Sequence, residues 1–227
     1  IAVRGTSFID IETGELWPWR SVTAWHLFQA WLNGETGQVR DYTGWMKANK
    51  ITMGRVTSMY NGGLGRFIPA EYLHYWEGME EFFQAMDGIG IALEFTIFCD
   101  AQRSPLDTVD QRVHYQRVRD VVSRHPHVVI EIVNERWQNG VDVEAIMKQD
   151  SRIIQATGAY DESDKGIYTY PVLNYITDHT PRDDEWPRKA RRLQETQAAL
   201  GKPCVADEPM GIGRIEPPPA SQQRSLV

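Results

Sequence analysis

The stretch VVIEIVNE, residues 128 to 135, is a run of mostly β-branched residues that ends in an asparagine and a glutamate. This composition is typical of a strand buried on both faces of a sheet. A carboxylate at the end of such a strand has two interpretations. It is either a functional residue or a solvated residue at the start of a loop. We therefore take Glu135 as a candidate catalytic residue. The hypothesis requires a second carboxylate at the end of another strand.

Segments of strand type and of helix type alternate along the chain. After a lead-in hairpin over residues 1–20, with ETGE at 12–15 as its turn, the sequence predicts strands over 21–28, 51–60, 91–100, 128–135, 166–173, 174–181 and 204–209. It predicts helices over 41–50, 69–88, 109–127, 143–158 and 185–203. Such alternation indicates βα units and a parallel sheet.

Two α/β architectures fit this pattern, an open doubly wound sheet and a closed (β/α)₈ TIM barrel. The open sheet usually carries a glycine-rich phosphate loop after its first strand, and NGGLGRF at 61–67 lacks the required glycine spacing. Polar residues at the carboxyl ends of several strands favour the barrel, because barrel enzymes keep their active sites there. We expect one barrel domain over residues 1–227. Too little chain follows the last predicted strand for an eighth βα unit, so that unit is expected to be missing, truncated or supplied by another segment.

Bulk composition excludes several classes of partner. The chain has 227 residues and a formal net charge of −7, which argues against a nucleic-acid backbone or an anionic membrane surface as partner. The chain contains no run of about 18 apolar residues, which is the length needed to span a bilayer. The first residues lack a signal-peptide pattern, but a signal can be removed, so a secreted or periplasmic location stays open, as does the oligomeric state. Cys99 and Cys204 show no metal-ligand spacing and are interpreted as buried thiols.

The second carboxylate is Glu208, which follows Asp207 at the end of the last predicted strand. A barrel would place Glu135 and Glu208 over the same mouth, although they are far apart along the chain. Paired carboxylates are what glycoside hydrolysis needs: one donates a proton to the leaving oxygen, and the other faces the anomeric carbon. Their environments must hold their pKa values apart. A cation near the ionised carboxylate would lower the pKa of that group, and Arg55, at the end of the strand over 51–60, is a candidate for this cation.

With these motifs in place, the chain resembles the clan A glycoside hydrolases, closest to the cellulase-like families. The similar segments are KITMGRV at 50–56, IEIVNER at 130–136, ITDHTPR at 176–182 and CVADEP at 204–209, besides the lead-in hairpin. The resemblance implies a TIM barrel and cleavage of β-glycosidic bonds with retention. It implies that Asn134 binds the sugar 2-hydroxyl, Glu135 is the general acid/base, Glu208 is the nucleophile and His179 lines the sugar site.

Aromatic and imidazole side chains near strand ends are the remaining candidates for substrate binding. Flat indole rings stack on the C–H faces of sugars, so Trp25, Trp137 and Trp186 are candidate subsite residues. His26 and His179 are expected to line the same cleft. No set of His, Asp and Glu has tight metal-ligand spacing, so we expect neither a catalytic metal nor another cofactor.

Two further carboxylates, Glu94 and Glu131, fall inside predicted strands. A charge that faces the interior needs a partner such as Arg55, so we interpret both either as structural residues or as residues that support the site from behind.

The favoured hypothesis is a retaining glycoside hydrolase acting on an oligo- or polysaccharide. The chain departs from the family pattern after the strand ends, where Arg136, Pro181 and Pro209 stand at positions usually held by other residues. These departures keep a second hypothesis open, a non-catalytic carbohydrate-binding barrel. A third is an open-sheet enzyme that acts on another substrate.

Overall fold

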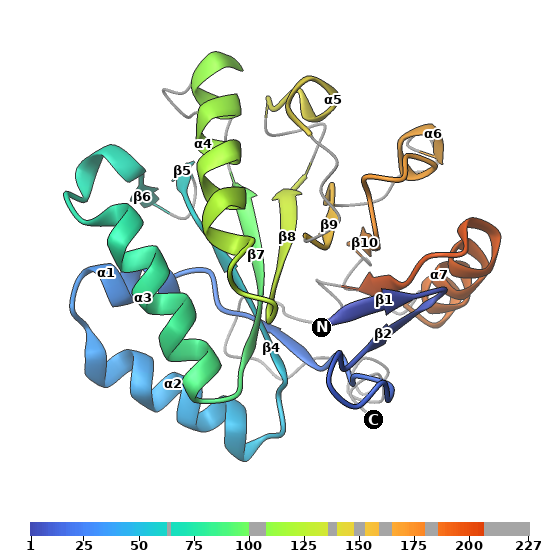
Figure 1. Cartoon of the computed structure of the whole chain (residues 1–227), viewed down its shortest axis with the longest axis horizontal. Coiled ribbons are helices and arrows are strands. Elements are labelled where there is room, and N and C mark those ends of the chain that lie inside the picture. Colours follow the sequence, from blue (N-terminus) through green and yellow to red (C-terminus); the bar gives the residue numbers. More distant parts are fainter. Residues whose placement is uncertain are drawn as a thin grey trace.

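The computed structural model describes residues 1–62, 65–99, 108–135, 140–147, 153–158, 165–179 and 186–206. Its centre is a five-stranded parallel sheet in the order β3-β4-β7-β8-β9 (Figure 1). These strands are β3 (Ser21–Thr23), β4 (Met53–Thr57), β7 (Ala92–Phe98), β8 (Val128–Val133) and β9 (Gln155–Ala156). A second parallel pair consists of β10 (Ile176–Asp178) and β11 (Cys204–Ala206).

Helices and two hairpins complete the described chain. The helices are α1 (Leu27–Leu32), α2 (Thr36–Ala48), the 3-10 helix η1 (Pro69–Glu71), α3 (Tyr75–Gly88), α4 (Thr108–Val122), α5 (Val143–Ile146), α6 (Lys165–Tyr168) and α7 (Trp186–Leu200). The antiparallel hairpins are β1 (Ala2–Arg4) with β2 (Ser7–Ile9), and β5 (Tyr60–Gly62) with β6 (Gly65–Phe67). Strand order in the main sheet follows chain order without a reversal. This is the order of a barrel, whereas a doubly wound sheet reverses direction at a switch point.

The predicted parallel α/β sheet is confirmed, but one helix assignment and one strand assignment are wrong. The segment 143–158 was expected to be one helix, yet α5 ends at Ile146 and Gln155–Ala156 form β9 beside β8. The segment 166–173 was expected to be a strand, and α6 occupies its beginning. At Gln155–Ala156, pairing with the edge of β8 outweighs the helix propensity of the residues, because propensity is a weak preference that tertiary contacts override.

Several boundaries also differ from expectation. The helix predicted over 41–50 is α2, which begins at Thr36, and the strand predicted over 51–60 is β4, which ends at Thr57. The strand expected over 21–28 ends at Thr23, and its last apolar residues belong to the start of α1, because a short apolar run fits both strand and helix. The lead-in hairpin exists, but the turn between its two strands lies at Gly5 and not at ETGE. ETGE lies in a second turn, which is closed by a bridge between Ile9 and Leu16. Asp10 caps that turn, and the backbone N–H groups of Thr13 and Glu12 hold the pKa of its carboxyl below the usual value.

The outer face of the main sheet, which we define as the face toward the helices, carries the larger apolar core. Side chains alternate between faces along a strand, so Leu93 and Phe95 of β7 and Ile130 of β8 all point to this face. They pack in one buried cluster with residues of α1, α3 and α4. Figure 1 shows α3 and α4 on one side of β7 and β8, and the β1–β2 hairpin on the other side.

The inner face, opposite the helices, is divided into two layers. Near the amino ends of the strands it is apolar: Met53, Ala92 and Val129 pack with Phe8 of the hairpin and with Tyr175. Nearer the carboxyl ends it is polar, and the polar residues there are fully buried. They are Arg55, Thr57, Glu94, Thr96 and Glu131. The hairpin thus covers the apolar end of the inner face and leaves the polar end for the site.

Cys99 and Cys204 are free thiols, Cys99 buried and Cys204 partly buried. Burial raises the pKa of the Cys204 thiol to about 12. Among the helices within the described ranges, none has both the length and the apolar composition needed to cross a membrane.

The histidine of α4 is part of the core. His114 is buried, and its Nε2 lies 3.1 Å from the hydroxyl of Ser58, which donates a hydrogen bond of 2.6 Å to the carbonyl of Ile97. Burial, with a smaller contribution from Arg117, lowers the pKa of His114 from 6.5 to about 3. The ring is therefore neutral in the folded protein.

The first prediction concerns the hairpin that covers the inner face. The ring of Phe8 is centred 4.5 Å from that of Trp19 and 5.7 Å from that of Tyr175. Phe8→Ala is expected to lower the free energy of unfolding by about 3–5 kcal/mol, because it leaves a cavity in a packed layer. The measurement is urea denaturation. The control is Leu73→Ala, at a side chain that is 97% exposed, where a change within about 0.5 kcal/mol is expected. Equal effects of the two substitutions would contradict the packed inner layer.

The second prediction concerns acid stability. Between pH 6.5 and 3 the unfolded chain binds a proton at His114 that the folded chain does not, so stability falls as pH decreases through this window. One proton corresponds to a slope of up to about 1.4 kcal/mol per pH unit. Urea denaturation at several pH values should show a shallower slope for His114→Gln than for the unsubstituted protein. Identical slopes would show that His114 does not remain neutral on folding.

Candidate active site

A buried ion pair lies at the centre of the polar layer of the inner face. Arg55 of β4 donates from Nε to one carboxylate oxygen of Glu131 at 2.9 Å and from Nη2 to the other at 2.8 Å. Both side chains are completely buried. The two residues belong to the strands on either side of β7. Thr96 of β7, which lies opposite Glu131 in the register, donates its hydroxyl to Glu131 Oε2 at 2.5 Å. We call Arg55, Glu131 and Thr96 the Arg55 cluster.

The cluster reaches the Asn-Glu motif through the same guanidinium. Nη2 of Arg55 also donates to Oδ1 of Asn134 at 2.8 Å and lies 3.4 Å from Nε2 of His179. Arginine can only donate, so Nε2 of His179 is the accepting nitrogen and the ring proton is on Nδ1. That Nδ1 lies 3.6 Å from Oε1 of Glu135. A chain of polar contacts therefore runs from Arg55 to Glu135.

Exposure increases along this chain. Arg55 is fully buried, the side chain of His179 is 14% exposed, and that of Glu135 is 30% exposed. The Asn-Glu pair follows β8 directly, and His179 follows β10, so the carboxyl ends of two strands meet here. A carboxylate that is accessible at one end and backed by fixed polar groups at the other can exchange protons with a bound substrate.

An aromatic wall adjoins the cluster. The guanidinium carbon of Arg55 lies 4.5 Å from the ring centre of Trp25, a cation–π contact. Nδ1 of the next residue, His26, lies 2.7 Å from the hydroxyl of Tyr60. Burial is the main cause that raises the pKa of Tyr60 to about 12, so its hydroxyl stays protonated.

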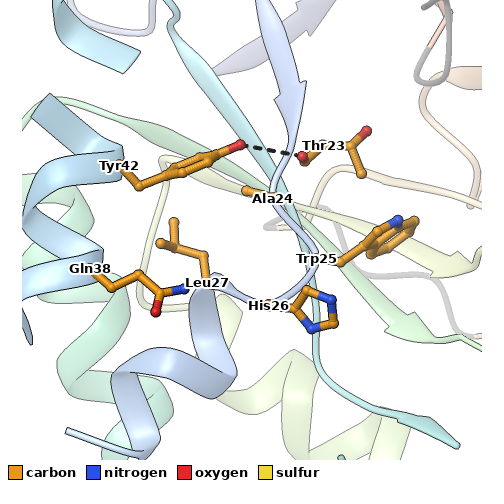
Figure 2. A pocket seen from close by; sticks show the side chains of 7 residues that line it. All are labelled: Thr23, Ala24, Trp25, His26, Leu27, Gln38 and Tyr42. Carbon is orange, nitrogen blue, oxygen red and sulfur yellow. Dashed lines mark hydrogen bonds between the residues drawn. The ribbon is translucent and has the colours of Figure 1, made fainter. Parts of the chain in front are cut away.

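A pocket of about 250 Å³ lies beside this wall, where the chain leaves β3. Figure 2 shows Tyr42 and Gln38 of α2 on one side of the loop, and Trp25 and His26 on the other. The Tyr42 hydroxyl donates to the carbonyl of Thr23 at 3.4 Å. The pocket is lined by Thr23, Ala24, Trp25, His26, Leu27, Gln38 and Tyr42. It provides an apolar surface next to the polar cluster.

The structure brings most of the predicted site residues together. Arg55, Asn134, Glu135, His179 and Trp25 belong to one connected set of contacts. His26 lies at the neighbouring pocket and contacts Tyr60.

The other predicted site residues cannot be placed. Glu208 and Trp137 lie outside the described residues, and so does the side chain of Trp186 at the start of α7. Thr96 and Tyr60 were not predicted from the sequence. For Thr96 the available signal was its alternation with Glu94, which puts both on one face.

The described part of the chain contains no group of three or more His, Cys, Asp or Glu residues that could hold a metal ion.

Gly158 makes room for the cluster. Its φ is +89°, and a Cβ there would lie 1.5 Å from the carbonyl oxygen of Val133 and 2.9 Å from Oε1 of Glu131. A side chain at this position would push against the backbone of β8 and against the carboxylate that binds Arg55. The glycine is therefore required by both backbone conformation and space.

The third prediction tests this close approach. Gly158→Ala is expected to destabilise the protein by about 1–3 kcal/mol more than Gly5→Ala does, because overpacking is added to the cost of a positive φ. Gly5 is a matched control, since its φ is +58° and nothing lies within 4 Å of a Cβ there. The measurement is urea denaturation of both variants. Equal losses would mean that space at Gly158 is not limiting.

Comparison with known proteins identifies the class of fold. No family model matches the sequence, and no curated protein matches it. Solved structures do match: the chain is similar in fold to several glycoside hydrolases.

Three of these structures show the extent of the likeness. A glycoside hydrolase family 5 mannosidase from Rhizomucor miehei, in complex with mannosyl-fructose, has a TM-score of 0.61 and 14% identity, over 88% of this chain and 70% of that one. The β-mannanase of Thermomonospora fusca, in complex with mannohexaose, has a TM-score of 0.56 and 14% identity, over 89% and 73%. ScGas2 has a TM-score of 0.61 and 14% identity, over 99% and 55%. At this low identity, the structural similarity shows a likeness of fold alone.

Proposed function

We propose that this protein is a retaining glycoside hydrolase that cleaves β-glycosidic bonds in an oligo- or polysaccharide, and that its complete fold is a closed (β/α)₈ barrel. One observation carries the proposal. The Asn134–Glu135 pair lies at the carboxyl end of a parallel strand, joined to Arg55 and His179, in a fold shared with glycoside hydrolases. The carboxyl end of the strands is where barrel enzymes bind their substrates.

Glu135 is the proposed general acid/base and Glu208 the proposed nucleophile. Strand register supports this pairing: Asp178 lies opposite Ala206, so β10 and β11 end at the same edge of their sheet. His179, the residue after Asp178, contacts Glu135 across to β8. Glu208 comes two positions after Ala206 in the sequence. The proposed nucleophile thus follows a strand whose neighbour already reaches the acid/base.

The reaction takes two displacements. In the first, the Glu208 carboxylate attacks the anomeric carbon while Glu135 gives its proton to the leaving glycosidic oxygen, which forms a covalent glycosyl-enzyme. In the second, Glu135 removes a proton from water, and the water oxygen displaces Glu208 from the sugar. Two inversions give net retention. Asn134 is proposed to bind the sugar 2-hydroxyl.

Aromatic residues are proposed to form the subsites. Trp25 borders both the Arg55 cluster and the 250 Å³ pocket, so a sugar stacked on its ring would adjoin the catalytic end of the site. His26 is proposed to hydrogen-bond a sugar from the same loop, and Trp137 and Trp186 to extend the site. Since several matched structures are mannosidases or mannanases, β-mannosides and mannans are the first substrates to test.

The fourth prediction separates the two carboxylates. Glu208→Ala and Glu135→Ala should each lower kcat on a natural glycan by at least about 10²–10⁴-fold. Added azide should restore turnover of an activated aryl β-glycoside in both variants. It should give the inverted glycosyl azide with Glu208→Ala, where azide replaces the nucleophile. With Glu135→Ala it should give the retained azide, because azide then attacks the glycosyl-enzyme.

The control for this experiment is Glu81→Ala, at an exposed position of α3, which should keep full turnover. Unchanged turnover in Glu208→Ala would remove that residue from the mechanism. Saturable binding of oligosaccharides by the unsubstituted protein, without cleavage across a broad glycoside panel, would instead favour a carbohydrate-binding barrel.

A further inference from the structure

We propose that Glu131 is a positioning residue of the site: it orients the guanidinium of Arg55, and through it the amide of Asn134 and the ring of His179. This inference rests on the proposed function, because the groups that it orients are those proposed to act on a sugar. The evidence is the set of hydrogen bonds in the Arg55 cluster and the direction in which each bond can run.

The first step concerns the two hydrogens on Nη2 of Arg55. One is used at 2.8 Å by Oε1 of Glu131. The same carboxylate accepts from Nε through its other oxygen, so two hydrogen bonds from two nitrogens fix the guanidinium against Glu131. Nη2 has a second hydrogen and two further polar neighbours. These neighbours are Oδ1 of Asn134 at 2.8 Å and Nε2 of His179 at 3.4 Å.

The second step concerns what this direction does to Asn134. An arginine presents only donors, so the atom of the amide that faces it is the oxygen. The NH₂ group of Asn134 is consequently turned away from Arg55 and is available as a donor. A sugar hydroxyl bound there would accept from Asn134. By the same reasoning the proton of His179 is placed on the nitrogen that faces Glu135.

The third step concerns what holds Glu131 itself. Its side chain is completely buried, and the hydroxyl of Thr96 donates to the oxygen that also accepts from Nε of Arg55. The absence of a side chain at Gly158 lets the backbone after β9 approach the other oxygen. Trp25 covers the guanidinium at 4.5 Å. Charge, hydrogen bonds and packing therefore all favour one orientation of the pair.

Glu94 provides a comparison within the same layer. It is also a completely buried carboxylate on the inner face, and it lies opposite Arg55 in the strand register. Its Oε1 accepts from the hydroxyl of Tyr175 at 2.9 Å. Tyr175 packs with the hairpin end of the interior, so this bond points away from the Asn-Glu motif. Glu94 therefore has a structural role. Glu131 instead contacts Arg55, which in turn contacts Asn134.

The test is a double-mutant cycle on kcat/KM for a glycoside that the unsubstituted protein cleaves. Glu131→Gln is expected to lower kcat/KM by about 10- to 100-fold. In the Asn134→Ala background the same substitution should cost at least about 5-fold less, because the amide that it misorients is gone and only the contribution through His179 remains. The matched control cycle uses Glu94→Gln, whose effect should be the same in both backgrounds. Additive effects of Glu131→Gln and Asn134→Ala would overturn the proposal.

A milder variant guards against loss of folding. Thr96→Val removes the hydroxyl that holds Glu131 and leaves all charges in place, so it should lower kcat/KM by a few-fold and show the same coupling to Asn134→Ala. Thr96→Ser should restore the activity. A Thr96→Val effect that Thr96→Ser leaves uncorrected would contradict the proposed role.

A second measurement does not depend on catalysis. The ¹⁵N NMR signals of the Arg55 side chain, assigned by their loss in Arg55→Lys, should show slow rotation of the guanidinium in the unsubstituted protein and fast rotation in Glu131→Gln. Equal rotation in both proteins would show that Glu131 does not hold Arg55. If no glycoside is cleaved, the proposed function fails, and the NMR comparison still decides whether Glu131 fixes the guanidinium.

Discussion

Two opposite charges taken fully out of water have to satisfy each other, and the site depends on this constraint. Arg55 and Glu131 are both completely buried. Removing each charge from water costs several kcal/mol, and their mutual attraction offsets this cost only if the geometry of the pair is good. Two hydrogen bonds, one to each oxygen of the carboxylate, supply that geometry. Because strands β4, β7 and β8 carry the pair and Thr96 between them, the sheet has to form before the site exists.

The division of the inner face into two layers explains why the site lies where it does. The N-terminal hairpin covers the apolar residues at the amino ends of the strands. The buried polar residues lie nearer the carboxyl ends, next to the Asn-Glu motif. Arg55, Asn134 and His179 are connected there with Glu135. A fold shared with glycoside hydrolases at 14% identity is consistent with this division, since folds constrain where a site lies more strongly than what it does.

Local patterns were sufficient for the long elements and insufficient for the short ones. The strand that becomes β8 and the helix that becomes α3 were predicted because each has a sustained apolar pattern. The two-residue strand β9 was missed: its residues favour a helix by themselves, and only the free edge of β8 makes them a strand. In the same way, the short helix α6 has no pattern that distinguishes it from a strand.

The sequence by itself determined the parallel α/β class, the place of Asn134 and Glu135 at a strand end, and the need of Glu131 for a charged partner. These follow from alternation along a strand and from the cost of burying a charge, both of which are local properties. Only the tertiary structure decided which nitrogen of His179 faces Arg55, which atom of the Asn134 amide accepts from Arg55, and that Gly158 must lack a side chain. Those depend on the distances and directions between residues from different strands, and no pattern along one strand contains them.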